Sequence, residues 1–312
     1  MHTSSVLGLR VSVVIPAFNS AWSIERTLAS VLSQTMQDFE VIVVDDGSTD
    51  ALQEAVGRAA QDDRRVRVIR QDNRGLAGAR NRGIREARAP LVAPLDADDT
   101  WERDYLQSMI EALDGDSAAP FAFSYHFRMD ENDRLLPSRH NAPPPRHDFV
   151  GLLAMNAVGC GSAAVFRRDL VLAAGGYDET LADRAGRGAE DWKLILTLAA
   201  TGKPRLIARP LVGYRHVAGG MSQGNPDAQL ASMLTVIDDI RAAYGPLPRS
   251  AIRNARTMAM AWLLPAFLRQ RRWGKAAVLG VRAYLLNPGW FLDANVRGAH
   301  WNWLQGRLRR SS

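Results

Sequence analysis

The sequence has a single cysteine, Cys160, among its 312 residues. One thiol cannot form a disulfide within the chain, and Cys160 does not belong to any Cys/His cluster of the kind that binds zinc. A disulfide-stabilised fold and a structural zinc fold are therefore excluded. Such a chain suits a reducing compartment, and Cys160 is expected to be a small, buried apolar residue.

Long apolar segments are also missing. The longest one near the C-terminus, residues 258–268, contains Pro265 and is shorter than the roughly 20 residues that cross a bilayer. The first ten residues show no basic segment followed by a long apolar one, so no secretory signal is expected. We expect a cytoplasmic protein that does not span the membrane.

Acidic residues are nearly absent from residue 241 onward, where 13 Lys and Arg stand against Asp293 alone, a formal charge of +12. The preceding residues carry 26 basic and 32 acidic side chains, a charge of −6, which disfavours nucleic acid as a partner. This basic segment also carries Trp262, Trp273, Trp290, Trp301 and Trp303. The segment from residue 241 either contacts the anionic inner face of the cell membrane or is a helical packing surface with exposed arginines.

Short β-branched runs alternate with amphipathic segments over the first hundred residues. The expected strands lie at 11–15, 39–44, 65–69 and 91–95. The expected helices lie at 23–32 and 73–88, and a further one follows residues 45–50 and ends at residue 60. This alternation over short loops predicts βαβ units and a largely parallel, doubly wound sheet. Ligands of such sheets bind beyond the carboxyl ends of the strands.

The pattern loosens after residue 115. The expected elements there are an antiparallel strand at 121–127, a helix at 149–156, a strand at 161–166, a helix at 190–199, and two short strands at 205–208 and 212–215. Residues 180–188 lack apolar periodicity, and residues 216–227 are rich in glycine, so both are expected to be mobile loops. From there to the end the pattern is helical.

Acidic residues gather directly after two of the expected strands. Asp45 and Asp46 follow the strand at 39–44, and the segment PLDADD at 94–99 follows the strand at 91–95. A lone D-x-D is usually a solvated turn. Hard divalent cations, however, prefer carboxylate oxygens and leave room for phosphate oxygens. An Mg²⁺ or Mn²⁺ ion that bridges a diphosphate therefore fits Asp98, with Asp96 or Asp99 assisting.

Six ordered motifs resemble the family 2 glycosyltransferases with the GT-A fold. They are VVIPAFNS (13–20), VVDDGSTD (43–50), NRGLAGARNRGI (73–84), PLDADD (94–99), GGYDE (175–179) and GAEDWKL (188–194). The resemblance implies an α/β fold of the GT-A nucleotide-diphospho-sugar transferase type, with a mostly parallel central sheet. It also implies a nucleotide-sugar donor, a divalent metal, and inversion at the anomeric carbon. The expected domains are a GT-A catalytic domain at 1–225 and a basic, Trp-rich helical extension at 226–312.

The resemblance also implies roles for single residues. Contacts with the nucleotide sugar are expected from Pro16, Phe18, Asn19, Asp46, Arg80, Asp96 and Ala97. Within this set Asp46 would hold the nucleobase and Asp96 would lean toward the ribose. Asp98 would hold the metal, and Asp191 would deprotonate the acceptor hydroxyl as the general base.

His216 is a further candidate for the metal or the diphosphate. It directly follows Arg215, whereas the matching histidine of the family lies further along the chain, so a solvated loop histidine is the alternative.

Several of these residues have structural alternatives. Asp45 and Asp50 would cap the following helix. Arg80 and Asn81 would pack a glycine-bearing helix, and Glu190 would only face a helix dipole. The tryptophans Trp22, Trp101 and Trp192 would line the core or a pocket wall.

The sequence therefore favours an inverting glycosyltransferase that acts on a glycan or lipid-linked acceptor in surface polysaccharide or glycolipid synthesis. A non-catalytic glycan- or nucleotide-binding module is the alternative from another class. A metal-dependent nucleotidyltransferase would need a glycine-rich loop bearing a lysine after the first strand, and a dehydrogenase would need G-x-G-x-x-G there. Residues 16–19 read Pro-Ala-Phe-Asn instead.

Overall fold

The computed structural model describes residues 8–136, 146–186, 188–217 and 224–290. The chain divides into two compact units. The first unit holds the residues up to 127 together with 158–179 and 201–215, and the second holds 128–157, 180–200 and the residues from 216 onward. The expected domain boundary at residue 225 stays a prediction.

One mixed sheet runs through the described residues in the order β3-β2-β1-β4-β8-β6-β9-β5, and β7 pairs with β6. The strands are β1 (Val11–Ala17), β2 (Phe39–Asp45), β3 (Val66–Arg70), β4 (Leu91–Pro94), β5 (Thr100–Trp101), β6 (Phe121–Met129), β7 (Leu135–Leu136), β8 (Ala164–Arg167) and β9 (Arg205–Arg215). Strands β3, β2, β1 and β4 are parallel to one another. The pairings β4–β8, β6–β8 and β5–β9 are antiparallel. The expected α/β sheet with an antiparallel strand at 121–127 is thereby confirmed.

The described residues also form helices. They are α1 (Ile24–Leu32), α2 (Leu52–Ala60), α3 (Gly75–Glu86), α4 (Tyr105–Asp114), α5 (Phe149–Ala154), α6 (Arg168–Ala173), α7 (Leu181–Ala185), α8 (Glu190–Ala199), α9 (Pro226–Tyr244), α10 (Arg249–Arg269) and α11 (Trp273–Leu286), with a 3₁₀ turn η1 at Gly161–Ala163. In α1 the apolar periodicity becomes a buried face made by Ile24, Leu28 and Val31. Cys160 is buried, as expected.

Two expectations about strands need correction. Strand β1 continues through Pro16 to Ala17. The nitrogen of Pro16 is on the β4 side, where the register ends at Val14, so no β4 residue requires its missing N–H. The strands expected at 205–208 and 212–215 form a single strand, β9.

The segment at 180–188, expected as a mobile loop, contains helix α7, which is anchored by the buried Leu181. Five residues are too few to show a helical period, which explains why the pattern did not reveal α7. In the glycine-rich segment at 216–227, residues 218–223 lie outside the described residues.

Helix α3 is held close to the sheet along its length. Gly83 faces β1, and a Cβ at this position would overlap the side chain of Val14. The backbone of α3 therefore approaches the strand more closely than any larger residue allows.

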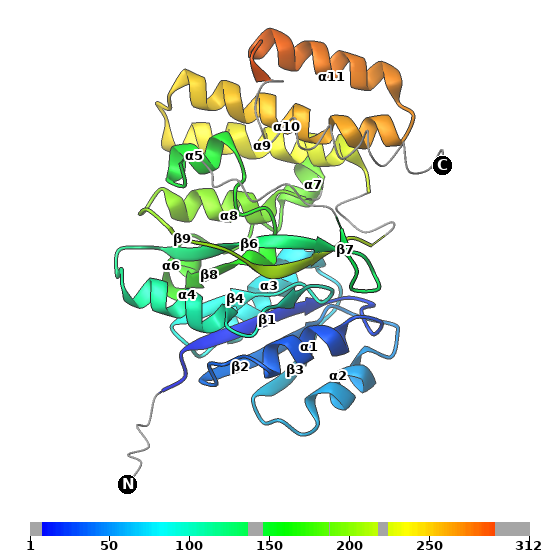
Figure 1. Ribbon diagram of the computed structural model, residues 1–312, viewed down its shortest axis with the longest axis vertical. Helices are drawn as coiled ribbons and strands as arrows, with labels where there is room; N and C mark the ends of the chain where they lie inside the picture. The colour runs from blue at the N-terminus through cyan, green and yellow to red at the C-terminus, as the bar shows by residue number, and fades with distance from the viewer. Residues whose placement is uncertain (1–7, 137–145, 187, 218–223, 291–312) are drawn as a thin grey trace. The chain divides into compact units, whose positions relative to one another are not determined.

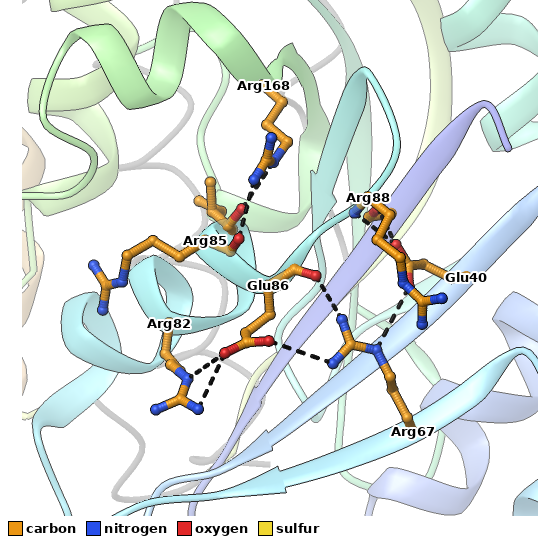
Figure 2. Close-up of polar contacts among 9 residues, drawn as sticks. Glu40, Arg67, Arg82, Arg85, Glu86, Arg88 and Arg168 are labelled. Atoms are coloured by element: carbon orange, nitrogen blue, oxygen red, sulfur yellow. Dashed lines mark hydrogen bonds and ion pairs between the residues drawn. The ribbon is translucent and has the colours of Figure 1, made fainter.

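Arginines cover the C-terminal end of α3 (Figure 2). Arg168 donates to the carbonyl oxygens of Ile84 and Arg85 at 3.0 Å, and Arg67 donates to that of Glu86 at 2.6 Å. The last carbonyls of a helix have no partner inside the helix and carry its negative end. The three contacts satisfy these carbonyls and fix the position of α3, which carries Arg80 and Asn81.

A buried glutamate balances part of this positive charge. Glu40, 5% exposed, forms ion pairs with Arg67 at 3.5 Å and Arg88 at 3.2 Å, and it accepts a hydrogen bond from Ser12 at 2.7 Å (Figure 2). A buried carboxylate is tolerated only when it is paired in this way. Strands β1, β2 and β3 are thus tied to the same end of α3.

The C-terminal helices of the second unit share their own apolar core. It is formed by Met260, Leu263 and Phe267 of α10 with Ala276, Leu279 and Ala283 of α11, and side chains from α9 pack against it. The helical region expected from residue 226 is confirmed as far as Leu286, whereas Trp301 and Trp303 lie outside the described residues. None of the helices in the described part of the chain is both long enough and apolar enough to cross a membrane.

Candidate active site

The segment from Asp96 to Asp99 forms a closed turn at the carboxyl end of β4. Leu95 N–H still donates to Val14 of β1 at 2.9 Å, and Asp99 N–H donates back to the Asp96 carbonyl at 3.0 Å. The side chains of Asp96 and Asp98 are half-buried, whereas that of Asp99 is completely buried. The three acids, which look equivalent in the sequence, therefore lie in different surroundings.

Helix α1 holds this turn from one side. Ser23 and Thr27 both donate to the carbonyl oxygen of Ala97, at 2.8 and 2.9 Å, and Thr27 also contacts the carbonyl of Asp99 at 2.8 Å. The two hydroxyls are one helical turn apart and both are buried. Ala97 is buried as well, so the structure shows it as part of this anchor, and its expected contact with the donor stays a prediction.

Asp99 is the second anchor of the turn. Its Oδ2 accepts from Ser162 Oγ at 2.6 Å, and its Oδ1 accepts from the N–H of Arg215 at 2.9 Å. Burial raises the pKa of Asp99 well above its usual value, and the nearby charges of Asp98 and Asp96 raise it further. The expectation that Asp99 assists a metal is not supported by this geometry, because both carboxylate oxygens already face donors within the fold.

The Ser162→Ala variant is expected to have a free energy of unfolding about 1–3 kcal/mol lower than the parent protein. The Oγ atom of Ser162 donates to Asp99 Oδ2 and also accepts from Asp96 N–H at 3.1 Å, so its loss leaves both of these groups without that partner. Urea denaturation followed by circular dichroism measures the difference. Ser124→Ala is the matched control, because within the described residues the hydrogen bond of this equally buried hydroxyl goes to the carbonyl of its neighbour Tyr125 alone. Equal losses in the two variants would contradict the anchoring role.

Asp96 is held by Arg80. The guanidinium contacts Asp96 Oδ1 at 2.6 Å, is only 2% exposed, and lies 5.1 Å from the ring of Tyr177. The space for it depends on Gly161, because a Cβ there would come within 2.6 Å of the guanidinium. Arg80 thus acts on the turn through Asp96, and its expected contact with the donor stays a prediction.

The motif at residues 175–179 fastens the other side of α3. Asn81 donates to the Tyr177 carbonyl at 2.8 Å and to Glu179 at 2.9 Å, and it accepts from Tyr177 N–H at 2.8 Å. Gly176 has a positive φ of 76°, and a Cβ there would overlap the Asn81 side chain. The structural alternative for Asn81 is therefore confirmed.

Asp98 differs from both of its neighbours. In the described part of the chain no other side chain donates to its carboxylate, and Arg215 Nε contacts its carbonyl oxygen at 2.6 Å. Burial raises the pKa of Asp98 to about 6, with the charge of Asp96 adding to this rise and Arg215 opposing it. A half-buried carboxylate with a charged neighbour and no side-chain donor among the described residues suits a divalent cation, which would relieve this repulsion. The described residues form no cluster of three or more metal-binding side chains.

Four residues expected to contact the nucleotide sugar lie at or just beyond the ends of β1 and β2. Pro16 is buried within β1, while Phe18 is 50% exposed just beyond it. Asn19, at a positive φ of 51°, accepts from Thr49 N–H at 2.8 Å. Asp46 is 2% exposed; its Oδ1 accepts from Gln71 at 2.7 Å and from a backbone N–H at 2.9 Å. Within the described residues no hydrogen-bond donor contacts Asp46 Oδ2, so this oxygen can accept a hydrogen bond from a ligand.

Asp45 and Asp50 hold the loops of this region. Asp45 contacts Ser48 N–H at 2.8 Å and forms an ion pair with Arg70 at 2.6 Å, while Asp50 accepts from Ala21 N–H at 2.9 Å. The residue before α2 is Ala51, and no side chain caps that helix. Neither Asp45 nor Asp50 caps α2, so that expectation is wrong. Both residues instead hold loops through hydrogen bonds, which confirms that they have structural roles.

The remaining two predicted site residues belong to the second unit. Asp191 lies in the first turn of α8, where its Oδ1 accepts from Trp192 N–H at 2.6 Å. His216 is half-buried, and its Nε2 accepts from Arg128 Nε at 2.8 Å, so it is not a solvated loop histidine. The proposed roles of Asp191 as base and His216 as metal ligand stay predictions.

The tryptophans divide between the core and the surface. Trp192 and Trp101 are 2% and 5% exposed, which confirms them as core residues. Trp22 is 48% exposed, so it is not a core residue, and its place in a pocket wall stays a prediction. Arg26 lies over its ring at 5.8 Å.

Sequence reasoning missed the residues that hold the turn: Ser23, Thr27, Ser162 and the backbone of Arg215. A signal was present for two of them, because Ser23 and Thr27 are four residues apart on the apolar face of α1. Ser162 and Arg215 are far away in sequence and gave none.

The sequence matches the model of Glycosyl transferase family 2 over residues 12–173. It is also 32% identical over 219 residues to the amylovoran biosynthesis glycosyltransferase AmsB of Erwinia amylovora, a match that covers 68% of this chain and 71% of AmsB. The chain belongs to glycosyltransferase family 2. A further relative, the putative glycosyltransferase EpsH of Bacillus subtilis, is 30% identical over 165 residues, or 52% of this chain and 48% of EpsH. The chain thus spans about half the length of EpsH, and 22% of some other curated relatives.

Two solved structures share the fold of this family 2 chain. A structure of S. aureus TarS in complex with UDP-GlcNAc aligns with a TM-score of 0.62 at 18% identity, covering 83% of this chain and 73% of that one. The mannosyltransferase PcManGT from Pyrobaculum calidifontis, in complex with GDP-Man and Mn²⁺, aligns with a TM-score of 0.58 at 22% identity, covering 96% and 85%. The expected GT-A type of α/β fold is thereby confirmed.

Proposed function

We propose that this family 2 protein transfers a sugar from a nucleotide-diphosphate donor to an acceptor hydroxyl, with Mg²⁺ or Mn²⁺ and with inversion at the anomeric carbon. The observation that carries the proposal is the turn at residues 96–99. The fold fixes its backbone and buries Asp99, while the carboxylate of Asp98 lies half-buried beside Asp96 without a side-chain donor in the described residues. A structural turn has no need of such a carboxylate.

The residues of the turn would divide the work between metal and donor. Asp98 would hold the divalent cation, and Arg80 would keep Asp96 directed toward the ribose. When bound, the cation supplies positive charge that stabilises the departing nucleotide diphosphate. Because the turn is anchored before the ligand arrives, little reorganisation is needed during transfer.

The nucleobase would bind beyond the ends of β1 and β2. The exposed ring of Phe18 offers an apolar face for a base, and the Oδ2 of Asp46 can accept a hydrogen bond from it. Pro16 and Asn19 would shape this pocket through the backbone that they fix.

Asp191 would be the general base. In an inverting displacement the acceptor hydroxyl loses its proton as its oxygen attacks the anomeric carbon, and a carboxylate can take this proton directly. His216 would contact the metal or the diphosphate as a further ligand.

The relatives support the substrate class. TarS binds UDP-GlcNAc, PcManGT binds GDP-Man with Mn²⁺, and AmsB acts in amylovoran biosynthesis. By analogy, this chain would act on a glycan or lipid-linked acceptor in surface polysaccharide or glycolipid synthesis. The basic residues from 241 onward support an anionic membrane surface as a further partner.

A thermal-shift screen of nucleotide sugars tests the proposal. UDP-GlcNAc, GDP-Man, UDP and GDP are added with Mn²⁺ or with EDTA, and at least one is expected to raise the Tm only when Mn²⁺ is present. A ligand at a hundred times its Kd stabilises a protein by about 2.7 kcal/mol, a shift of several degrees for a domain of this size.

Release of the nucleotide diphosphate in the presence of an acceptor separates the candidate functions. Binding without release of any kind would favour the non-catalytic module, and release of pyrophosphate from a nucleoside triphosphate would favour the nucleotidyltransferase. The absence of binding by every nucleotide tried would overturn the proposal.

A further inference from the structure

Helix α11 buries one face in the apolar core of the second unit. Ala276, Leu279 and Ala283 are at most 7% exposed and contact the side chains of α10. In Figure 1 α11 is the orange helix that lies along α10. Because residues three and four apart share a helix face, these three side chains form a single stripe along α11.

The opposite face of α11 is apolar too. Val278, Val281, Tyr284 and Leu285 are 52, 59, 52 and 74% exposed. Successive residues of a helix are about 100° apart, so Val281 points away from the stripe that contains Leu279. A helix at a protein surface ordinarily carries polar side chains on its outer face. Four exposed apolar side chains on one helix face are typical of a surface that binds something.

The charged residues of α10 and α11 themselves have one sign. Residues 241–290 contain nine Lys and Arg and no Asp or Glu. Arg282 lies on α11 itself and Arg271 just before it; both are exposed, and neither has an ion-pair partner within the part of the chain that the structure describes. Lys275 is paired with Asp227 at 2.7 Å. Asp227 thus compensates Lys275, whereas Arg282 adds to α11 a positive charge that no acid of the described residues compensates.

We propose that the outward face of α11, made by Val278, Val281, Tyr284 and Leu285, docks on an anionic lipid surface. Apolar side chains in the middle with Arg at the border match a helix that lies in the plane of a bilayer interface. A helix of 14 residues is about 21 Å long, less than the roughly 30 Å of a bilayer core, so α11 would lie on the membrane. A second copy of the chain fits less well, since an isologous interface would present the same residues from both sides, and residues 241–290 offer no Asp or Glu to pair with Arg282.

This inference locates on one helix the membrane surface named in the proposed function, and its test is independent of catalysis. The full chain, without nucleotide or acceptor, is floated with vesicles of phosphatidylcholine alone or of phosphatidylcholine with phosphatidylglycerol. Binding to the anionic vesicles is expected to exceed binding to the neutral ones and to weaken as salt is added.

Two variants test which face is responsible. The double variant Val281→Gln with Leu285→Gln is expected to lower vesicle binding at least about tenfold, because it removes apolar surface that would enter the interface. Arg282→Glu is expected to lower binding to anionic vesicles roughly fivefold at low salt. All three changes lie at exposed positions, so the Tm is expected to stay the same.

Leu135→Gln is the matched control, because Leu135 in β7 is also 74% exposed but lies in another part of the second unit. It is expected to bind vesicles like the parent chain. The inference is overturned if the full chain fails to bind anionic vesicles, or if the double variant binds as the parent does. It is also overturned if light scattering shows a dimer that the double variant dissolves, since the occupant would then be a second copy.

Discussion

Replacing Asp98 with Asn is expected to lower the turnover of nucleotide sugar about a thousandfold, or about 4 kcal/mol of transition-state stabilisation. The amide has almost the same shape but lacks the charge that would hold the divalent cation beside the leaving diphosphate. The thermal shift produced by nucleotide with Mn²⁺ is expected to disappear as well. Release of nucleotide diphosphate and the Mn²⁺-dependent Tm shift are the two measurements.

The same variant is expected to be more stable than the parent protein when no metal is present. Burial and the charge of Asp96 disfavour the Asp98 carboxylate, so its neutral replacement is expected to raise the free energy of unfolding, on the order of 1 kcal/mol. A gain in stability together with a loss of turnover separates a ligand-binding role from a structural one. Replacing the buried anchor Asp99 with Asn should instead lower stability, since its oxygens accept from Ser162 and from the Arg215 backbone.

Asp62→Asn is the matched control. Asp62 is an exposed residue after α2 with a φ of 64°, a backbone conformation that Asn adopts readily. Neither turnover nor the Mn²⁺-dependent shift is expected to change in this variant. An Asp98→Asn protein that keeps both properties would show that the metal does not bind at this carboxylate.

The parallel half of the fold could be predicted from the sequence because local patterns determine it. Strands β1, β2 and β4 are β-branched or apolar runs buried on both faces, and the amphipathic period of α1 gives its buried face directly. Helix α7 was missed because its single buried leucine, Leu181, carries no period. Local patterns thus succeed where an element is long enough to repeat.

The site was predictable in composition but not in detail. The sequence shows three acids at the end of β4 without showing which of them faces a ligand. That distinction depends on Ser162, which is 63 residues from Asp99, and on Arg80, which holds Asp96. Burial and long-range hydrogen bonds decide the role of each carboxylate, and neither is written in a short motif.

Asp191→Asn is expected to lower the rate of transfer by about 10²–10⁴-fold while leaving nucleotide and metal binding unchanged. An amide cannot take the proton of the acceptor hydroxyl, but its oxygen can still accept from Trp192 N–H, so the first turn of α8 is preserved. Single-turnover release of nucleotide diphosphate measures the rate, and the Mn²⁺-dependent Tm shift measures binding. A loss of rate with intact binding is the pattern that distinguishes a base from a ligand of the donor.

Glu190→Gln provides the control within the same helix turn. Both acids lie at the N-terminal end of α8, where a negative charge contributes about 0.3–1 kcal/mol through the helix dipole. If the dipole were the whole role of Asp191, the two variants would lose the same small amount of stability and little rate. Only proton abstraction predicts that Asp191→Asn lowers the transfer rate far more than Glu190→Gln does at equal stability. Equal transfer rates in the two variants would show that Asp191 is not the base.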